Sequence, residues 1–228
     1  CNPNALGVQP RILSPIQRGS HGPFALSFWN AACKAFMLSH REPNKLDVRR
    51  SGASIFPSYL TRVVTARRLS GCSCYRRRVI DEFSFDTKLI RWGFSEDLDF
   101  SHRVHKKYPG SLYAIPNASV MHFSSTKARL PINLEVSMKT VYTFYVFFKD
   151  VFEKSAVNLV AFLWSQLGNV LMEAGKSVLE TTSRQRQYLI YLIFSYLLAL
   201  RYLARILRGD LEFINRAVIA LGKEEDAE

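Results

Sequence analysis

The chain has 228 residues, of which 48% are hydrophobic and 13% aromatic, and its formal net charge is +12. Disordered tails, collagen-like fibres and low-complexity linkers are poor in core-forming side chains, so this composition excludes them. A chain of this length can bury a sizeable core in one large domain or two small ones. The excess of Lys and Arg favours an anionic partner, which can be nucleic acid, anionic lipid or a phosphorylated small molecule.

Four cysteines are too few to cross-link a chain of this size, and the pair Cys72 and Cys74 has no histidine nearby to complete a zinc site. We therefore expect reduced, structural thiols. The sequence begins at Cys1, without a basic and apolar leader. Because it does not begin with Met, we expect it to be a piece of a longer protein.

Prolines interrupt residues 1–60 repeatedly, so we expect loops there around one amphipathic helix at 24–42. From residue 60 to about 125, short strands and helices alternate, which predicts a mixed α/β layer. The expected elements of this layer are a strand at 59–69, a helix at 76–82, and strands at 111–116 and 118–123 that are separated by a Pro-Asn turn.

Residues 132–222 contain no proline and predict long helices. Apolar runs lie at 141–148, 155–172 and 187–200. Polar residues interrupt the second run, and the third is about 21 Å long as a helix against a hydrocarbon core of about 30 Å. Neither run therefore predicts a transmembrane helix.

Arginines follow the third apolar run at helical spacing, at Arg201, Arg205 and Arg208. Long cationic side chains beside an apolar surface suit a membrane interface, where they reach lipid phosphates. We therefore expect these helices to dock on an anionic membrane surface. The alternatives are an ordinary helical bundle with a solvated basic face and helices that span the membrane.

The stretch from Gly93 to Arg103 carries the most chemical information. Gly93 permits a turn, and Ser95 is a good N-cap for a helix that begins at Glu96. Glu96 and Asp97 then lie in the first turn, where the helix dipole keeps carboxylates ionised. A fixed, ionised carboxylate suits a general base that acts on a hydroxyl group. The alternative is that Glu96 and Asp97 have only a structural role, because Ser-Glu-Asp is a common start for a helix.

Asp97 and Asp99 also form a D-x-D pattern, which holds a metal ion in many proteins. Here the pattern opens an amphipathic helix instead of ending a buried strand, so we expect no metal on it. Asp99 and Arg103 lie four residues apart, and this spacing predicts a local ion pair.

Two further features stand outside this stretch. His122 closes a strand-like run, although a lone histidine is more often structural than a ligand. Gly71 opens a segment of small residues that precedes Arg76 and Arg77. Small residues let a ligand approach closely and adjacent arginines can hold phosphate, whereas the alternative is a solvated helix start.

In this order, the residues resemble the C-terminal half of a family 2 glycosyltransferase with a GT-A fold. The series consists of Gly71, Arg76-Arg77, Phe85-Asp86, Gly93, Glu96-Asp97, Asp99, Arg103, Pro116 and His122. The resemblance covers residues 60–125 closely, and the part with FFKD at 147–150 resembles the helical tail of bacterial members more loosely. It implies a partial α/β GT-A domain over residues 1–127 and an all-helical, membrane-associating region over residues 128–228.

The resemblance also implies an activity and its residues. A sugar would pass with inversion from a nucleotide-sugar donor to a hydroxyl of a saccharide or lipid-linked acceptor, in the synthesis of cell-surface polysaccharide or glycolipid. Asp97 takes the place of the catalytic base, with Glu96 beside it. His122 is the expected ligand of a divalent Mg²⁺ or Mn²⁺ ion and faces Asp97 across a shared cleft. The expected substrate-binding residues are Gly71, Arg76, Arg77, Trp92 and Arg103.

Members of this family also carry an N-terminal nucleotide-binding half with a metal-chelating D-x-D, and nothing here matches it. The resemblance therefore implies a truncated enzyme that is inactive alone and lacks the main metal carboxylates. We expect it on the cytoplasmic side of the plasma membrane, bound peripherally or weakly inserted, with no nucleic acid as partner. The alternative is a non-catalytic, basic protein that binds a membrane surface or nucleic acid.

Overall fold

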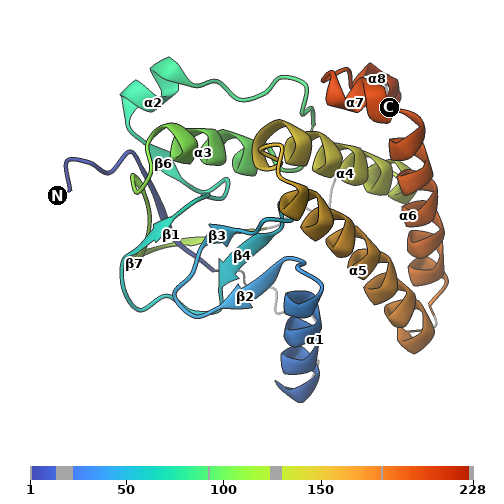
Figure 1. Cartoon of the computed structure of the whole chain (residues 1–228), viewed down its shortest axis with the longest axis horizontal. Coiled ribbons are helices and arrows are strands. Elements are labelled where there is room, and N and C mark those ends of the chain that lie inside the picture. Colours follow the sequence, from blue (N-terminus) through green and yellow to red (C-terminus); the bar gives the residue numbers. More distant parts are fainter. Residues whose placement is uncertain (1, 14–22, 92, 124–129, 181, 226–228) are drawn as a thin grey trace.

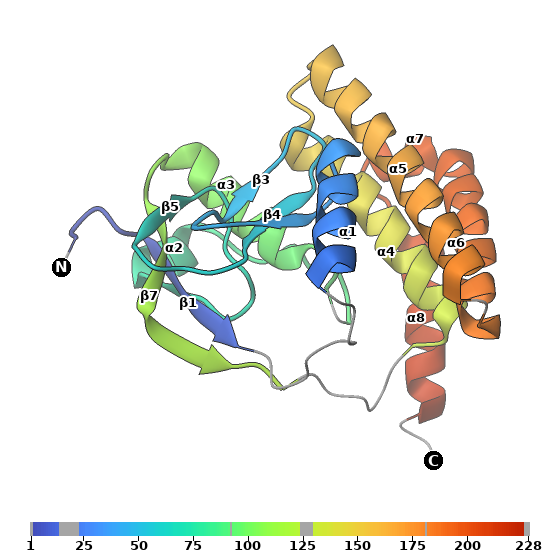
Figure 2. The ribbon, with the colours of Figure 1, turned by 90° about the horizontal axis from the view of Figure 1, so that it is seen from below.

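A computed structural model of the chain describes residues 2–13, 23–91, 93–123, 130–180 and 182–225. The strands gather with α2 and α3 on one side of the molecule, and the later helices form the other side (Figures 1 and 2). The strands are β1 (Gly7–Leu13), β2 (His40–Glu42), β3 (Asp47–Val48), β4 (Ser54–Pro57), β5 (Val64–Ala66), β6 (Cys74–Tyr75) and β7 (Leu112–Met121). The helices are α1 (Pro23–Ala35), α2 (Arg77–Glu82), α3 (Glu96–Lys107), α4 (Ile132–Val146), the π-helical segment η1 (Phe147–Val151), α5 (Ala156–Glu180), α6 (Ser183–Arg201), α7 (Leu203–Leu207) and α8 (Glu212–Glu225).

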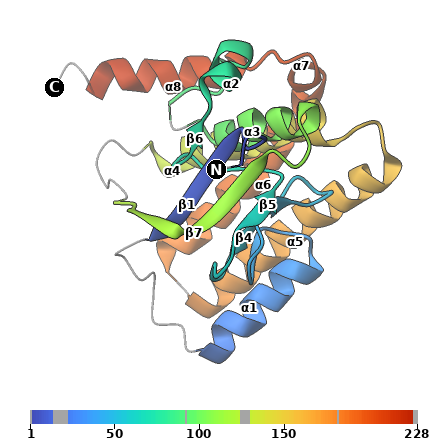
Figure 3. The same ribbon diagram turned by 90° about the vertical axis from the view of Figure 1, so that its left-hand side faces the viewer.

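The strands form two mixed sheets. The larger has the order β5-β7-β1-β6, with β1 parallel to β7 and antiparallel to β6. The smaller has the order β2-β4-β3, with β2 parallel and β3 antiparallel to β4. Figure 3 shows β1 and β7 side by side. The chain is therefore a mixed α/β protein in which helices predominate. This confirms the predicted combination of strands and helices.

The two strands expected around the Pro-Asn turn form one strand, β7. Ile115 of β7 pairs with Pro10 of β1, and the next pair along the ladder joins Ser119 to Arg11. The three residues between them, including Pro116, bulge out of the ladder. Proline has no N–H to donate, so it is tolerated in a strand at such a bulge.

The helix expected over 24–42 is shorter than predicted. Helix α1 ends at Ala35, and residues 40–42 form β2. Met37 has a positive φ of 54°, which ends helical geometry, and the Ser51 hydroxyl donates a hydrogen bond of 2.6 Å to the Met37 carbonyl oxygen. A contact with a distant serine therefore stabilises this turn, and the periodicity of the segment does not reveal it.

The proline-free part of the chain is helical, as predicted. Helix α4 continues into η1, and α5 and α6 are the two longest helices that follow. Within the described residues, no helix combines the length and the apolar character needed to cross a bilayer.

Helix α3 lies between the two hydrophobic cores. Its Phe100 and Val104 belong to the core under the larger sheet, together with Leu112 of β7. Its Leu98 belongs to the core around α4, which also contains Met138. Because both cores pack against α3, they fix the position of its first turn, where the two candidate carboxylates lie.

Candidate functional site

Helix α3 begins at Glu96, as predicted, but Ser95 does not cap it with its side chain. Ser95 has a positive φ of 69°, and Gly93 before it has a φ of 46°. A positive φ is strained for residues other than glycine, and a Cβ on Gly93 would also displace the Glu96 carboxylate, which lies 2.1 Å from that position. The chain therefore reaches α3 through a tight left-handed turn, and the prediction that the Ser95 side chain caps the helix is wrong.

Asp97 forms an ion pair with a residue that the sequence analysis did not single out. The guanidinium of Arg68 donates a hydrogen bond of 2.5 Å to Oδ2 of Asp97, and the Arg68 side chain is only 6% exposed. Arg68 also donates to the Ser54 hydroxyl and lies over the ring of Phe56 at 5.1 Å. The backbone N–H of Leu98 donates to the other oxygen of Asp97 at 2.8 Å. The Asp97 carboxylate is therefore held in one orientation.

Asp97 lines a cavity with a volume of about 520 Å³. The cavity lies between the turn before α3, the loop and strand around β4, and helices α4, α5 and α6. Its polar lining residues near Asp97 are Ser39, Ser51, Ser54, Arg68, Ser70 and Ser95. A volume of this size is within the range of roughly 300–1,000 Å³ that is typical of small-molecule sites.

Glu96 lies beside Asp97 on α3 but is not among the residues that line this cavity. Burial raises the pKa of Glu96, and the negative charge of Asp97 raises it further. At this position, desolvation therefore outweighs the stabilising effect of the helix dipole on the charged carboxylate.

His122 follows the end of β7 and is exposed. Its backbone N–H donates a hydrogen bond of 2.8 Å to the Leu13 carbonyl oxygen and so extends the pairing of β7 with β1. His122 does not line the cavity that contains Asp97. Asp97 and His122 therefore do not share this cavity, contrary to the expected common cleft. The role of His122 as a metal ligand stays a prediction.

The predicted substrate-binding arginines have partners within the protein. Arg76 donates to the Ala5 carbonyl oxygen at 2.6 Å, and Arg77 pairs with Asp81 at 2.7 Å. Arg103 pairs with the buried Asp99 at 2.7 Å, which confirms the expected local ion pair. Arg77 is nevertheless 85% exposed, and a substrate-binding role for the three arginines stays a prediction.

The two other predicted substrate-binding residues are Gly71 and Trp92. The space around Gly71 is open, since a Cβ there would meet nothing within 4 Å. No neighbouring backbone therefore requires glycine at this position. Trp92 lies outside the described residues.

A second charged cluster anchors α3 to the later helices. Lys149 of η1 binds Asp99 of α3 and also binds Asp86, at 2.6 Å, in the loop before α3. The buried carboxyl of Asp150 lies beside Asp99, and burial together with that negative neighbour raises the pKa of Asp150 to about 8. Oδ2 of Asp150 has no hydrogen-bond partner among the described groups. A proton on Asp150 therefore supplies the donor that this pair of carboxyls needs.

In the sequence, Asp86, Lys149 and Asp150 stand out only through the resemblance to glycosyltransferases. Their contact depends on a helix that packs against a loop about 60 residues away, so no local pattern predicted it. Arg68 was also missed, because it lies in a run of basic residues whose neighbours gave no sign of its burial.

Within the described residues, no group of three or more His, Cys, Asp or Glu side chains is arranged to hold a metal ion. The residues around Asp97 do not fit a divalent cation, since the positive charge of Arg68 already occupies that carboxylate. Among the described residues, Cys33, Cys72 and Cys74 form no disulfide. Comparison with known proteins finds no matching family model, no matching curated protein and no matching solved structure.

Proposed function

We propose that this chain is the acceptor-side part of an inverting glycosyltransferase, which transfers a sugar from a nucleotide-sugar to a saccharide or lipid-linked hydroxyl. The observation that carries the proposal is Asp97. It is an oriented carboxylate at a helix start, on the wall of a cavity large enough for a small molecule. The ordered series of residues that resembles family 2 glycosyltransferases supplies the reaction class.

In the proposed step, Asp97 accepts the proton of the acceptor hydroxyl. The oxygen of that hydroxyl forms a bond to the anomeric carbon, while the bond from this carbon to the diphosphate breaks on the opposite face and the nucleoside diphosphate leaves. A carboxylate has about four lone-pair sites, and Arg68 and the Leu98 N–H use two of them. Asp97 therefore retains the capacity to accept this proton.

The proposal assigns nucleotide-sugar binding, and any divalent cation that accompanies it, to residues outside these 228. No step is drawn through a metal on the described residues. A divalent ion bound elsewhere would offset the charge that develops on the departing diphosphate.

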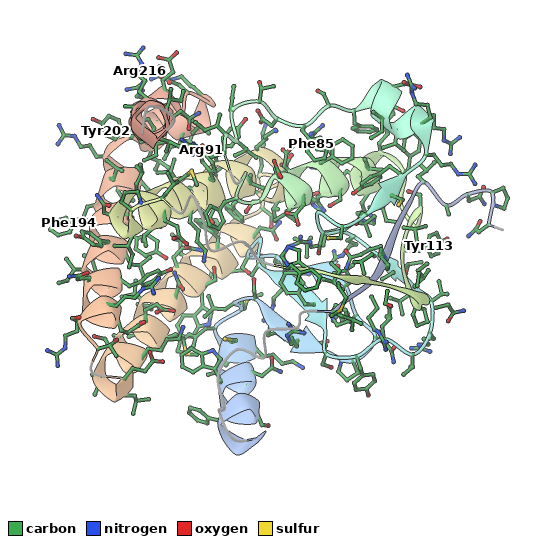
Figure 4. The ribbon with its side chains drawn as sticks, turned by 180° about the vertical axis from the view of Figure 1, so that it is seen from behind. Phe85, Arg91, Tyr113, Phe194, Tyr202 and Arg216 are labelled. Atoms are coloured by element: carbon green, nitrogen blue, oxygen red, sulfur yellow. The ribbon has the colours of Figure 1, made fainter. Side chains whose placement is uncertain are left out.

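The proposal includes peripheral attachment to an anionic membrane. Large apolar side chains are exposed along one face of α5, at Val157, Val160, Leu163, Trp164, Leu167 and Leu171, and along α6, at Ile190, Ile193, Phe194, Leu197 and Leu200. Phe194 points away from the helices into solvent (Figure 4). Apolar faces of this size need a covering partner, and the charge of +12 favours anionic lipid.

The test is sugar transfer by this chain joined to the coding sequence that precedes it, with UDP-, dTDP- and GDP-sugars as donors. We expect no transfer by the 228-residue chain alone. We expect transfer by the longer protein, and a loss of at least about 100-fold with Asp97→Asn, because the general base is removed. Asp81→Asn is the matched control, since Asp81 is exposed on α2 and pairs with Arg77 on the same helix.

Two results would count against the proposal. One is transfer by Asp97→Asn at the wild-type rate, and the other is transfer by the 228 residues alone. If neither protein transfers sugar but both bind vesicles, the alternative of a non-catalytic membrane-surface protein gains support. Salt-sensitive binding of DNA would instead favour the alternative of a non-catalytic protein that binds nucleic acid.

A further inference from the structure

The cavity at Asp97 continues well beyond the proposed base. It reaches between α4, α5 and α6, where it is lined by Lys139, Thr140, Gln166, Asn169, Glu173, Tyr188 and Tyr196. The proposed chemistry at Asp97 requires none of these side chains. They nevertheless share one cavity with it, so a molecule longer than a single sugar could contact both ends.

Helix α5 buries the apolar residues Ala161 and Phe162, but its middle part departs from the pattern of an ordinary surface helix. Gln166, Asn169 and Glu173 are spaced three and four residues apart, which places them on one face, and that face lines the cavity. The outward face carries large apolar side chains such as Val160, which is 66% exposed. A helix of a soluble protein usually buries its apolar face and exposes its polar one. The inward polar face therefore points to a hydrophilic ligand inside the cavity.

The inward polar groups are held in place by one another. The hydroxyl of Tyr196 on α6 donates a hydrogen bond of 3.0 Å to the side-chain amide oxygen Oε1 of Gln166. The side-chain amide of Asn169 donates one of 3.1 Å to the same hydroxyl. Gln166 also donates to Ser165 at 2.9 Å. Each side-chain amide has two N–H groups and a carbonyl with two lone pairs, so these bonds use only part of its capacity. The remaining donors and acceptors are available to a ligand.

The chemistry of this end of the cavity fits neutral hydroxyl groups. Gln166 and Asn169 offer both donors and acceptors, and a sugar hydroxyl uses both. Tyr188 and Tyr196 add an apolar ring face for the C–H groups of a sugar, together with a polar hydroxyl tip. Glu173 also lines the cavity and already accepts hydrogen bonds from Lys176 at 2.6 Å and from Gln185 at 2.7 Å.

We propose that the inner faces of α5 and α6 form a second saccharide subsite, which binds sugar units of the acceptor at a distance from the hydroxyl that reacts. The inference rests on the proposed function, because it takes Asp97 as the reacting end. In this arrangement the later helices select the acceptor chain, and Gln166 and Asn169 determine specificity.

The test is binding of neutral trisaccharides to the 228-residue chain, measured by saturation-transfer NMR. The probes are four trisaccharides built from glucose, N-acetylglucosamine, galactose and mannose, respectively. We expect at least one to bind, and we expect Gln166→Ala and Asn169→Ala to weaken it by at least about fivefold, as the loss of one or two net hydrogen bonds predicts. Gln187→Ala is the matched control, because Gln187 is exposed on α6 and does not line the cavity.

Thermal unfolding of each variant separates a lost contact from a lost fold. The proposal is overturned if no probe binds, or if folded Gln166→Ala and Asn169→Ala bind as the wild type does. Failure of the transferase proposal gives a different pattern. The trisaccharide would then bind and depend on Gln166, while Asp97→Asn would leave sugar transfer unchanged.

Discussion

Two buried carboxyls show how the environment of single residues determines their protonation. The pKa of Asp99 is lowered because its hydrogen bonds to Arg103 and Lys149 outweigh desolvation, whereas the pKa of Asp150 is raised to about 8 by burial and by Asp99 itself. One carboxyl therefore stays ionised while its neighbour keeps a proton. This pair joins α3 to η1, so its protonation affects the segment that carries Asp97.

The pair predicts a stability that decreases as pH rises. The unfolded Asp150 is ionised above about pH 4, whereas the folded one keeps its proton up to about 8, so stability falls between these values. Burial lowers the pKa of His102 to about 4, which acts in the opposite direction below about pH 6.5. Between pH 6.5 and 8 we therefore expect the free energy of unfolding to decrease by about 1–2 kcal/mol.

Asp150→Asn supplies the control for this pH dependence. The asparagine amide donates to Asp99 at every pH, so we expect the decrease between pH 6.5 and 8 to disappear in this variant. Urea unfolding at several pH values measures the effect. A decrease of equal size in the variant would show that another group is responsible.

At the scale of elements, α5 approaches the segment after α1 closely because it has a glycine at the contact. A Cβ on Gly168 would lie 2.3 Å from the Cβ of Phe36. The ring of Trp164 lies 5.4 Å from that of Phe36, and its indole N–H donates to the Ala35 carbonyl oxygen at 3.0 Å. These contacts fix α5, which lines the cavity, against the end of α1 and the turn that follows it.

Two glycine substitutions on α5 are expected to change stability in opposite directions. Gly168→Ala forces the helix away from Phe36 and should destabilise the protein by about 1–3 kcal/mol. Gly175→Ala meets nothing within 4 Å and should stabilise it by up to about 1 kcal/mol, because alanine favours the helix. Thermal or urea unfolding measures both. A stabilising Gly168→Ala would contradict the close packing of α5.

At the scale of the whole molecule, charge and exposed apolar surface act together. The strands and α3 carry the proposed chemistry, while α5 and α6 lie on the side of the molecule away from the larger sheet (Figure 2). Both helices expose large apolar side chains. This division suits a protein that works at an anionic interface with its cavity open to the acceptor.

Vesicle flotation tests this attachment. We expect the chain to float with vesicles of phosphatidylglycerol and phosphatidylcholine and less with phosphatidylcholine alone, since lipid charge contributes. Val160→Asp should reduce the bound fraction several-fold, because a charge enters the apolar face of α5. Val63→Asp is the matched control, since Val63 is also exposed but lies next to β5. If the two variants float equally, the apolar face of α5 does not contact the membrane.

Much of the local structure was readable in the sequence. The absence of proline and the apolar runs predicted the long helices, and the spacing of Asp99 and Arg103 predicted their ion pair. The start of α3 at Glu96 was also predicted. Each of these depends on residues within one or two helical turns, so local periodicity and spacing were sufficient.

The tertiary structure decided which residues surround Asp97. Arg68 is 29 residues away in sequence, and Gln166 and Tyr196 enter the same cavity from two later helices. The cavity excludes His122, which the sequence had suggested as a partner. These neighbours depend on how two hydrophobic cores pack on opposite sides of α3, and that packing sums many weak contacts between distant segments. The pattern of neighbouring residues in the sequence therefore does not predict which distant side chains these contacts bring together.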